Sequence, residues 1–184
     1  MDIAAVLASL EASSLAVAIR TTIVAFPLIE SLHVIGITLV FGTILVIDLR
    51  LLGLAWTRRA FSVIADDVLR WTWVAFGMSA ATGALMFITN AAAYYQNWYF
   101  RAKMLLLVLA GVNMVFFELT DRRKVLSWDR ERSAPPAGRI VATLSLAIWI
   151  GVIFLGRWVA FAPSDATAAP GEEVDFEKLE ELLK

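Results

Sequence analysis

The chain has 184 residues, of which 60% are hydrophobic and only 18% are charged. A typical soluble domain is about 45–50% apolar and about 25% charged, so this excess of apolar residues excludes a small water-soluble monomer. The 16 basic and 17 acidic residues nearly cancel, which leaves no basic surface for nucleic acid. Without cysteine and with a single histidine, the chain has no disulfide, no thiolate metal site and no intrachain bis-histidine haem.

Four stretches are long and apolar enough to cross a bilayer, which requires about 20 residues of helix. They cover about residues 27–47, 71–93, 102–119 and 140–162. Pro27 suits the first turn of the first span, and the run Ala134-Pro135-Pro136-Ala137-Gly138 separates the last two. The prediction is an all-α fold in which residues 27–162 form a bundle of four transmembrane helices.

Residues 1–26 are apolar but interrupted by Glu11, Ser13, Ser14 and Arg20. The opening Met-Asp lacks the basic region of a signal peptide, so a cleaved signal is not expected. One or two short helices lying in the membrane interface fit this pattern best. An extra span and an ordinary packed helix are the alternatives.

Lys and Arg are distributed unevenly between the two ends of the predicted bundle. The loops after the first and third spans, with their helix ends, hold ten of them, whereas the other end holds six, two of which lie in a distal acidic tail. Loops rich in Lys and Arg stay in the cytoplasm. The sequence therefore predicts a multi-pass protein of the bacterial inner membrane with both termini outside the cytoplasm.

Ionisable groups inside a bilayer are costly and usually functional, and one layer of them lies toward the predicted outer face. Glu30 and His33 are three residues apart and share one face of the first span. At 1.5 Å per residue, His33 lies about 9 Å and Met86 about 10 Å from that face. Three cationic side chains lie near the same face: Arg101, Lys103 and Arg157.

Three interpretations of this layer compete. In the first, His33 ligates the iron of a b-type haem, Met86 or water is the sixth ligand, and one of the three cationic side chains neutralises the propionates. In the second, Glu30 and His33 bind a proton, a metal or a small substrate. In the third, His33 only makes a hydrogen bond between helices.

A protease interpretation, prompted by Gly77-Met78-Ser79-Ala80, is rejected because of depth. Ser79 lies about 12 Å from the inner end of its predicted span, and His33 lies about 9 Å from the outer end of its own. Across about 30 Å of hydrocarbon this leaves about 9 Å between them, too far for a nucleophile and its base. No independent catalytic activity is expected.

A second polar layer lies toward the predicted inner face. Asp48 and Arg50 end the first span, and Glu118 ends the third together with Asp121 and Arg122. These residues are expected to form structural charge pairs at the level of the lipid headgroups. Asn113 lies deeper in the third span and is expected to form an interhelical hydrogen bond, which contributes on average about 0.6 kcal/mol.

Several of these residues recur in a pattern: Pro27-xx-Glu30-xx-His33-Val34-x-Gly36, Gly42 and Asp48-Leu49-Arg50-Leu51-Leu52-Gly53, then Phe100-Arg101-Ala102-Lys103 and Asn113. Over about residues 5–162 the chain resembles a bacterial family of four-helix membrane proteins classed as a domain of unknown function. More distantly, it is similar to the copper-resistance D and cytochrome b561-like proteins, in which bundle histidines hold haem. The resemblance implies the four-helix architecture and only a weak link to redox or metal chemistry.

The last segment, residues 163–184, has its own character. Residues 163–171 have the composition of a linker, and residues 172–184 have the pattern of a short amphipathic helix with Phe176, Leu179 and Leu183 on one face. Acidic residues dominate this tail, which disfavours anionic lipid. We expect it to dock on a protein partner outside the cytoplasm, with a solubilising or extraneous tail as the alternative.

Three functions remain open at this point. The first is a small membrane subunit for electron transfer, with haem b at His33 as its only cofactor. The second is a cofactor-free membrane anchor or assembly subunit for an extracytoplasmic partner, and the third is a transporter for a small solute or a metal. The bilayer is a partner in all three, nucleic acid in none, and a homo-oligomer is compatible with each.

Overall fold

The computed structural model describes residues 2–120 and 125–161, and every regular element in this part of the chain is a helix. Four of the helices are long and apolar enough to cross a membrane: α3 (Ala25–Leu51), α4 (Phe61–Thr89), α6 (Trp98–Thr120) and α8 (Pro136–Val159). The prediction of an all-helical protein with four candidate spans is confirmed, and the fold is compatible with a multi-pass membrane protein.

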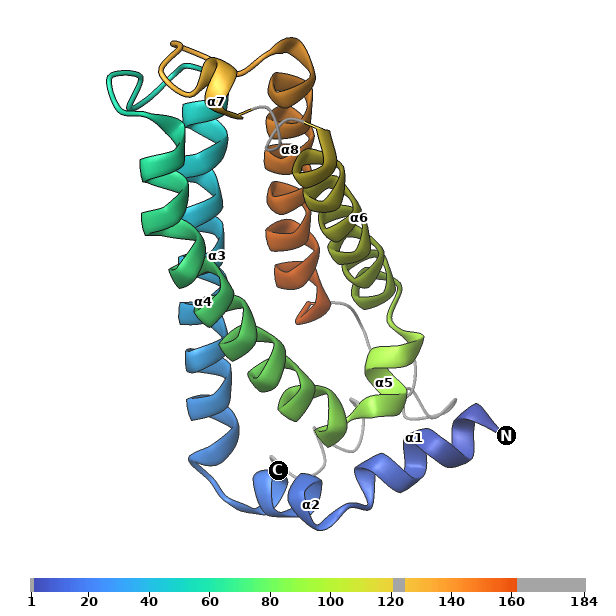
Figure 1. Ribbon diagram of the computed structural model, residues 1–184. Coiled ribbons are helices and arrows are strands. Elements are labelled where there is room, and N and C mark those ends of the chain that lie inside the picture. Colours follow the sequence, from blue (N-terminus) through green and yellow to red (C-terminus); the bar gives the residue numbers. More distant parts are fainter. Residues whose placement is uncertain (1, 121–124, 162–184) are drawn as a thin grey trace, which may run out of the picture.

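The four long helices lie in two pairs (Figure 1). Helix α3 packs along α4, helix α6 packs along α8, and contacts between α3 and α8 join the pairs. The loop from α3 to α4 and the short helix α7 (Val125–Trp128) lie at one end, which we call the α7 end. The short helices α1 (Ile3–Glu11), α2 (Ser14–Thr21) and α5 (Ala91–Gln96) lie at the opposite end, the α5 end.

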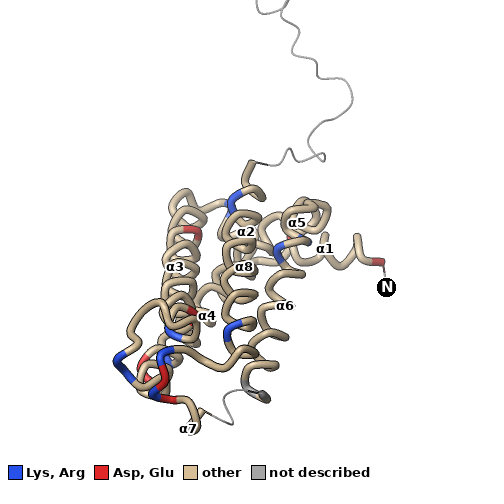
Figure 2. Tube along the Cα trace, turned by 90° about the horizontal axis from the view of Figure 1, so that it is seen from above, with Lys and Arg blue, Asp and Glu red and all other residues tan. Residues whose placement is uncertain are grey.

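Charged residues gather around α7 and the α3–α4 loop, whereas the long helices carry few of them (Figure 2). Many large apolar side chains on the outer faces of these helices are exposed, for example Val34, Leu105, Val112 and Phe154. A helix with an apolar outer surface is typical of one that is surrounded by lipid. The charged α7 end is accordingly expected to lie outside the hydrocarbon region of a membrane.

Helix α4 differs from its predicted span of residues 71–93. It begins at Phe61, ten residues earlier, because Asp66, Asp67 and Arg70 continue the helix although they interrupt the apolar run. It ends at Thr89, because Asn90 leaves the helical conformation at φ −155° and ψ 57° before α5 starts. The other spans extend a few residues beyond their predicted starts or ends.

The N-terminal helices are tied to the break between α4 and α5. The Arg20 guanidinium donates to the backbone oxygen of Thr89 at 2.8 Å and to that of Glu11 at 2.7 Å. The Glu11 carboxylate accepts from the backbone N–H of Ala92 at 2.8 Å. These bonds satisfy backbone groups that the helix ends leave without intrahelical partners. Helices α1 and α2 are bent by 53° at their junction and match the length and composition of one span only when they are taken together.

Candidate functional site

Arg50 joins the two loops at the α7 end. Its side chain is completely buried and donates to four backbone oxygens, those of Arg59 at 3.1 Å, Asp129 at 3.1 Å, Glu131 at 2.9 Å and Arg132 at 3.3 Å. We call these five residues the Arg50 network. Because a guanidinium offers five donors in a fixed plane, one side chain can hold both loops.

The same loops are held by two further features. The Asp129 carboxylate accepts from the backbone N–H of Ser62 at 2.7 Å and from its hydroxyl at 2.9 Å, which caps the start of α4 from another part of the chain. Gly53 has φ +74°, and a Cβ there would lie 2.8 Å from the backbone oxygen of Arg132. Glycine at this position therefore permits both the left-handed turn and the close approach of the loops.

The expected charge pairs of this layer are only partly visible. Arg50 bonds to backbone oxygens, and among the described residues no ion pair joins it to Asp48. The loops bury Arg50 among their own carbonyls, and the expected headgroup-level charge pairs stay a prediction. The side chain of Glu118, together with Asp121 and Arg122, lies outside what the structure describes.

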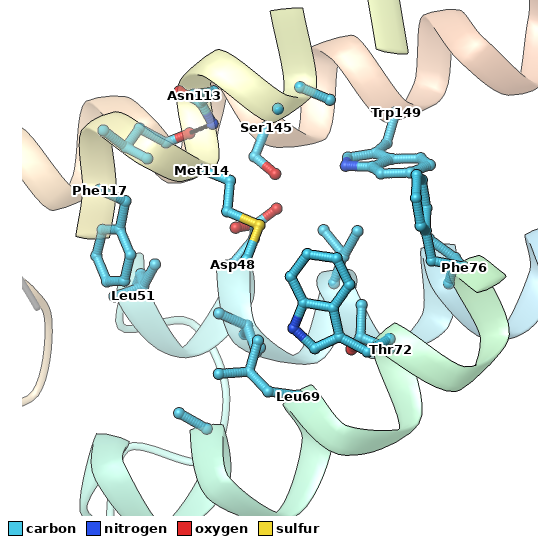
Figure 3. Close-up of a pocket in the computed structure, with 18 of the residues that line it drawn as sticks. Asp48, Leu51, Leu69, Thr72, Phe76, Asn113, Met114, Phe117, Ser145 and Trp149 are labelled. Carbon is cyan, nitrogen blue, oxygen red and sulfur yellow. Dashed lines mark hydrogen bonds between the residues drawn. The ribbon is translucent and has the colours of Figure 1, made fainter. Parts of the chain in front are cut away.

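Asp48 faces a cavity that lies between all four long helices (Figure 3). The cavity has a volume of about 260 Å³. Asp48 is only 4% exposed, and Ser145 of α8 lines the same cavity. One carboxylate oxygen of Asp48, Oδ2, is buried and has no hydrogen-bond partner. We call this region the Asp48 cavity.

The walls of the Asp48 cavity are mainly apolar and aromatic. Its polar lining comes from one residue or more on each of the long helices: Asp48 on α3, Thr72 and Trp73 on α4, Asn113 on α6, and Ser145 and Trp149 on α8. The Asn113 amide also donates to the backbone oxygen of Val141 at 3.1 Å, an interhelical hydrogen bond of the expected kind. A concave apolar site with a few convergent polar groups is typical of small-molecule binding sites.

Some lining residues are also exposed on the outer surface of the molecule. Trp73 is 57% exposed and Phe76 is 41% exposed on α4, and Met114 is 41% exposed on α6. These side chains therefore border an opening of the cavity between α4 and α6. Because this opening lies on the apolar sides of candidate spans, it would face lipid in a membrane.

His33 lies in the other half of α3, against α4. Its Nδ1 lies 2.9 Å from the backbone oxygen of Ser79 and 3.1 Å from the hydroxyl of Thr82. The Ser79 oxygen can only accept, so Nδ1 carries the proton and Nε2 holds the lone pair of the neutral ring. The ring packs on Gly83, where a Cβ would lie 3.0 Å from the His33 Cε1 atom.

The estimated 9 Å separation in depth between His33 and Ser79 is wrong. Each depth was measured from the end of a predicted span, and α4 begins ten residues before its predicted start. The protease interpretation still has no support, because His33 contacts the backbone oxygen of Ser79 and not its hydroxyl. That hydroxyl is buried without a hydrogen-bond partner and lies against Gly36.

The other residues of the predicted outer layer make no described hydrogen bond to His33. Met86 is half-buried on α4, Arg101 is exposed on α6, and the Arg157 guanidinium lies 5.0 Å from the centre of the Phe161 ring. Lys103 is half-buried against α8 at Gly156.

Glu30, the second residue proposed for metal binding, is exposed. Its negative charge acts on Tyr94 of α5, whose pKa is raised first by burial and then by Glu30. No group of three or more His, Asp or Glu side chains that could hold a metal ion occurs in the described part of the chain. The proposed docking face of the tail, Phe176, Leu179 and Leu183, lies beyond the described residues.

These observations define a class of protein: a helical chain with four candidate membrane spans and a cavity between them. A family model described as "Family of unknown function (DUF6644)" matches residues 10–162, and the chain belongs to this family. No curated protein and no solved structure matches the chain. The family carries no activity with it, so a function has to be argued from the cavity itself.

The Asp48 cavity was not predicted from the sequence, although a signal was present. Each predicted span has a polar residue near the same predicted face: Asp48, Thr72, Asn113 and Ser145. Asp48 was assigned to the headgroup layer because it follows the last residue of its predicted span, whereas α3 continues to Leu51.

Proposed function

We propose that this protein binds a small, largely apolar molecule in the Asp48 cavity, with the Asp48 carboxylate as its polar anchor. Among the functions open from the sequence, this belongs to the small-solute class. The observation that carries the proposal is the free Oδ2 of a carboxylate that is 4% exposed and faces a cavity of about 260 Å³.

A buried polar atom without a partner is costly, about 1–3 kcal/mol for a neutral group and more for a charged one. Most buried polar atoms in proteins are therefore bonded, and an exception calls for an explanation. A ligand that donates a hydrogen bond to Oδ2 supplies one. The apolar remainder of the cavity would hold the rest of that ligand, and the opening beside Trp73 and Met114 would admit it from the membrane.

We also propose that the four long helices form one bundle in a bacterial inner membrane, with the α7 end in the cytoplasm and α1 and α2 in the interface. The proposal is supported by the excess of Lys and Arg around the α7 end. Leu54→Cys and Gln96→Cys place a thiol at exposed positions of the two ends. A membrane-impermeant thiol reagent is expected to label position 96 in intact cells and position 54 only after lysis.

The cavity proposal is tested with the purified protein in phosphatidylcholine nanodiscs and 1-aminoanthracene, an uncharged probe that fluoresces in apolar sites. Saturable binding above the background of empty nanodiscs is expected. Ala110→Leu enlarges a side chain that lines the cavity, whereas Val112→Leu on the same helix enlarges an exposed one. Only the change at Ala110 is expected to reduce binding. Non-saturable uptake that neither variant changes would refute the proposal.

A second candidate is a haem-binding electron-transfer subunit, and the ring orientation of His33 supports it. The hydrogen bond from Nδ1 to the Ser79 oxygen is the arrangement that directs Nε2 of a histidine toward a metal. Met86 and the cations Arg101, Lys103 and Arg157 remain its proposed supporting residues. The test is the optical spectrum of protein purified from haem-replete cells, before and after dithionite. A haem band that His33→Ala abolishes is expected, and a colourless folded protein would refute this candidate.

A further inference from the structure

The charge of the Asp48 cavity restricts the chemistry of its ligand. Asp48 is the only ionisable residue among the described residues that line the cavity, and the other polar lining groups are hydroxyls, an amide and indoles. Arg50 is two residues away, but its donors are engaged by four backbone oxygens of the loops. An ionised Asp48 therefore has no described cation beside it in the cavity.

Aromatic rings line the same cavity as this carboxylate. Trp73 and Phe76 of α4, Phe117 of α6 and Trp149 of α8 all line the cavity (Figure 3). The face of an aromatic ring attracts cations, and the attraction reaches about 2 kcal/mol when the site is shielded from water. A carboxylate within a ring-lined, apolar cavity thus favours a positive charge that carries an apolar body.

We propose that the ligand is a lipophilic organic cation, namely a protonated amine on an apolar or aromatic body. This inference rests on the proposed function and specifies its substrate class. The ammonium group would donate to the Asp48 carboxylate, whose Oδ2 has no partner in the protein, and neutralise its charge, and the apolar body would lie among the rings. The exposed lining residues Trp73 and Met114 would admit it from the lipid side.

Other ligand classes fit less well. An anion would be repelled by Asp48, and a neutral alcohol could donate to Oδ2 but would leave the buried charge without a counter-ion. A metal ion such as Ca²⁺ requires six to eight oxygen ligands, whereas Asp48 is the only carboxylate among the described residues of the lining.

Three probes that share one body test the inference: 4-phenylbutylamine, 4-phenylbutan-1-ol and 4-phenylbutanoate. Like a lysine side chain, the amine is protonated at pH 7, whereas the acid is ionised. Each compound is titrated against 1-aminoanthracene bound to the protein in phosphatidylcholine nanodiscs. The amine is expected to displace the fluorophore at a concentration about tenfold or more below that of the alcohol, and the acid is expected to displace none.

Asp48→Asn keeps the shape of the side chain and removes its charge. In this variant the amine is expected to bind no better than the alcohol, with each displacement corrected for the affinity of 1-aminoanthracene measured in the same variant. The matched control is Asp67→Asn, which removes an exposed carboxylate from α4 and should leave the preference for the amine unchanged. A helical circular dichroism spectrum like that of the unaltered protein shows that the variant is folded, and the comparison of probes on the unaltered protein needs no variant.

The outcomes separate this inference from the proposed function. If the amine and the alcohol bind equally to the unaltered protein, the cation is wrong. If Asp48→Asn retains the preference for the amine, the pairing of the cation with Asp48 is wrong. In either case, saturable binding of 1-aminoanthracene still supports a ligand in the cavity. If neither 1-aminoanthracene nor any of the three probes binds, both are wrong.

Discussion

Asp48 and Arg50 are two residues apart on α3, carry opposite charges and are both buried, yet they serve different regions. Arg50 is 0% exposed, and all of its described hydrogen bonds go to backbone oxygens of the two loops at the α7 end. Asp48 is 4% exposed, lines the cavity and has one buried oxygen, Oδ2, without a hydrogen-bond partner. The neighbouring charges therefore do not neutralise each other.

The difference indicates which polar residues are structural. A buried group whose hydrogen-bonding capacity is met by the protein has no capacity left for a ligand, whereas a group with a free atom facing a cavity does. His33 resembles Arg50 in this respect at Nδ1, which is held by Ser79 and Thr82, and resembles Asp48 only through Nε2. Substitutions of the two kinds of buried group should therefore change the free energy of unfolding differently.

The largest loss of stability is expected for Arg50→Met. The change leaves four loop carbonyls without their donor, and removing one partner of a buried charged network costs about 3–5 kcal/mol. Arg50→Lys should recover little, because a single ammonium cannot reach the same oxygens as a planar guanidinium. Unfolding in mixed micelles of SDS and a non-ionic detergent gives the free energies.

Arg58→Met is the control for this comparison, because Arg58 lies in the same loop and is exposed. A change within about 0.5 kcal/mol is expected there. If Arg50→Met were equally mild, the network would not hold the loops and the division between the two regions would fail.

The next largest effect is expected for Gly36→Ala, in the tightly packed half of α3. A Cβ at Gly36 would collide with the Ser79 hydroxyl and lie 3.3 Å from the Ser79 backbone nitrogen. Such overpacking costs about 1–3 kcal/mol. It should also disturb the hydrogen bond of His33, which lies one turn away and bonds to the same residue.

Gly42→Ala on the same helix is the matched substitution, since a Cβ there would meet nothing within 4 Å. Alanine is a better helix former than glycine by about 0.8–1.0 kcal/mol, so the free energy of unfolding is expected to stay the same or to rise. Equal losses at the two positions would mean that the close contact at Gly36 does not limit the packing of α3 on α4.

A gain in stability of about 1 kcal/mol is expected for Asp48→Asn in the absence of ligand. The neutral amide avoids the cost of burying a charge whose Oδ2 atom has no partner. The sign is thus opposite to that of Arg50→Met. A loss of several kcal/mol on unfolding in mixed micelles would show that Asp48 is a structural residue and would contradict its assignment to a ligand site.

The long helices could be predicted because hydrophobicity over about 20 residues is a property of the local sequence. Their ends could not. The first ten residues of α4 include Asp66, Asp67 and Arg70. The start of this helix is capped by the Asp129 carboxylate, which comes from a distant loop. The break at Asn90 is likewise supported from elsewhere, by Arg20 and Glu11 of the N-terminal helices.

The errors in the predicted helix ends also affected the prediction of the candidate site. His33 and Asn113 were identified as polar residues inside spans, but the contact of His33 with Ser79 required the true length of α4. The importance of Asp48 could not be read from its type, because the faces of three other helices, α4, α6 and α8, decide whether this carboxylate meets a partner, water or a cavity. Ser145 and Trp149, which share the cavity with Asp48, were read only as part of an apolar span.

The smallest loss of stability is expected for Arg20→Ala at the α5 end. Its comparison with Arg50→Met tests whether burial, rather than the number of hydrogen bonds, decides how much such an arginine contributes. Arg20 resembles Arg50 because it donates to backbone oxygens, those of Thr89 and Glu11. It differs because it is exposed, so water can donate to the same backbone oxygens when the Arg20 side chain is removed. Hydrogen bonds of exposed charged groups contribute about 0.2–1 kcal/mol, and we expect a loss in this range.

A local readout makes this small effect measurable. Hydrogen exchange of the backbone amides near the break between α4 and α5 should become faster in Arg20→Ala, while exchange in the loops at the α7 end stays unchanged. In Arg50→Met the reverse pattern is expected. If Arg20→Ala cost as much as Arg50→Met, burial would not set the worth of an arginine that bonds to carbonyls. The contrast between satisfied and free buried groups would then lose its energetic basis, because the exposed α5 end would be held as firmly as the buried network.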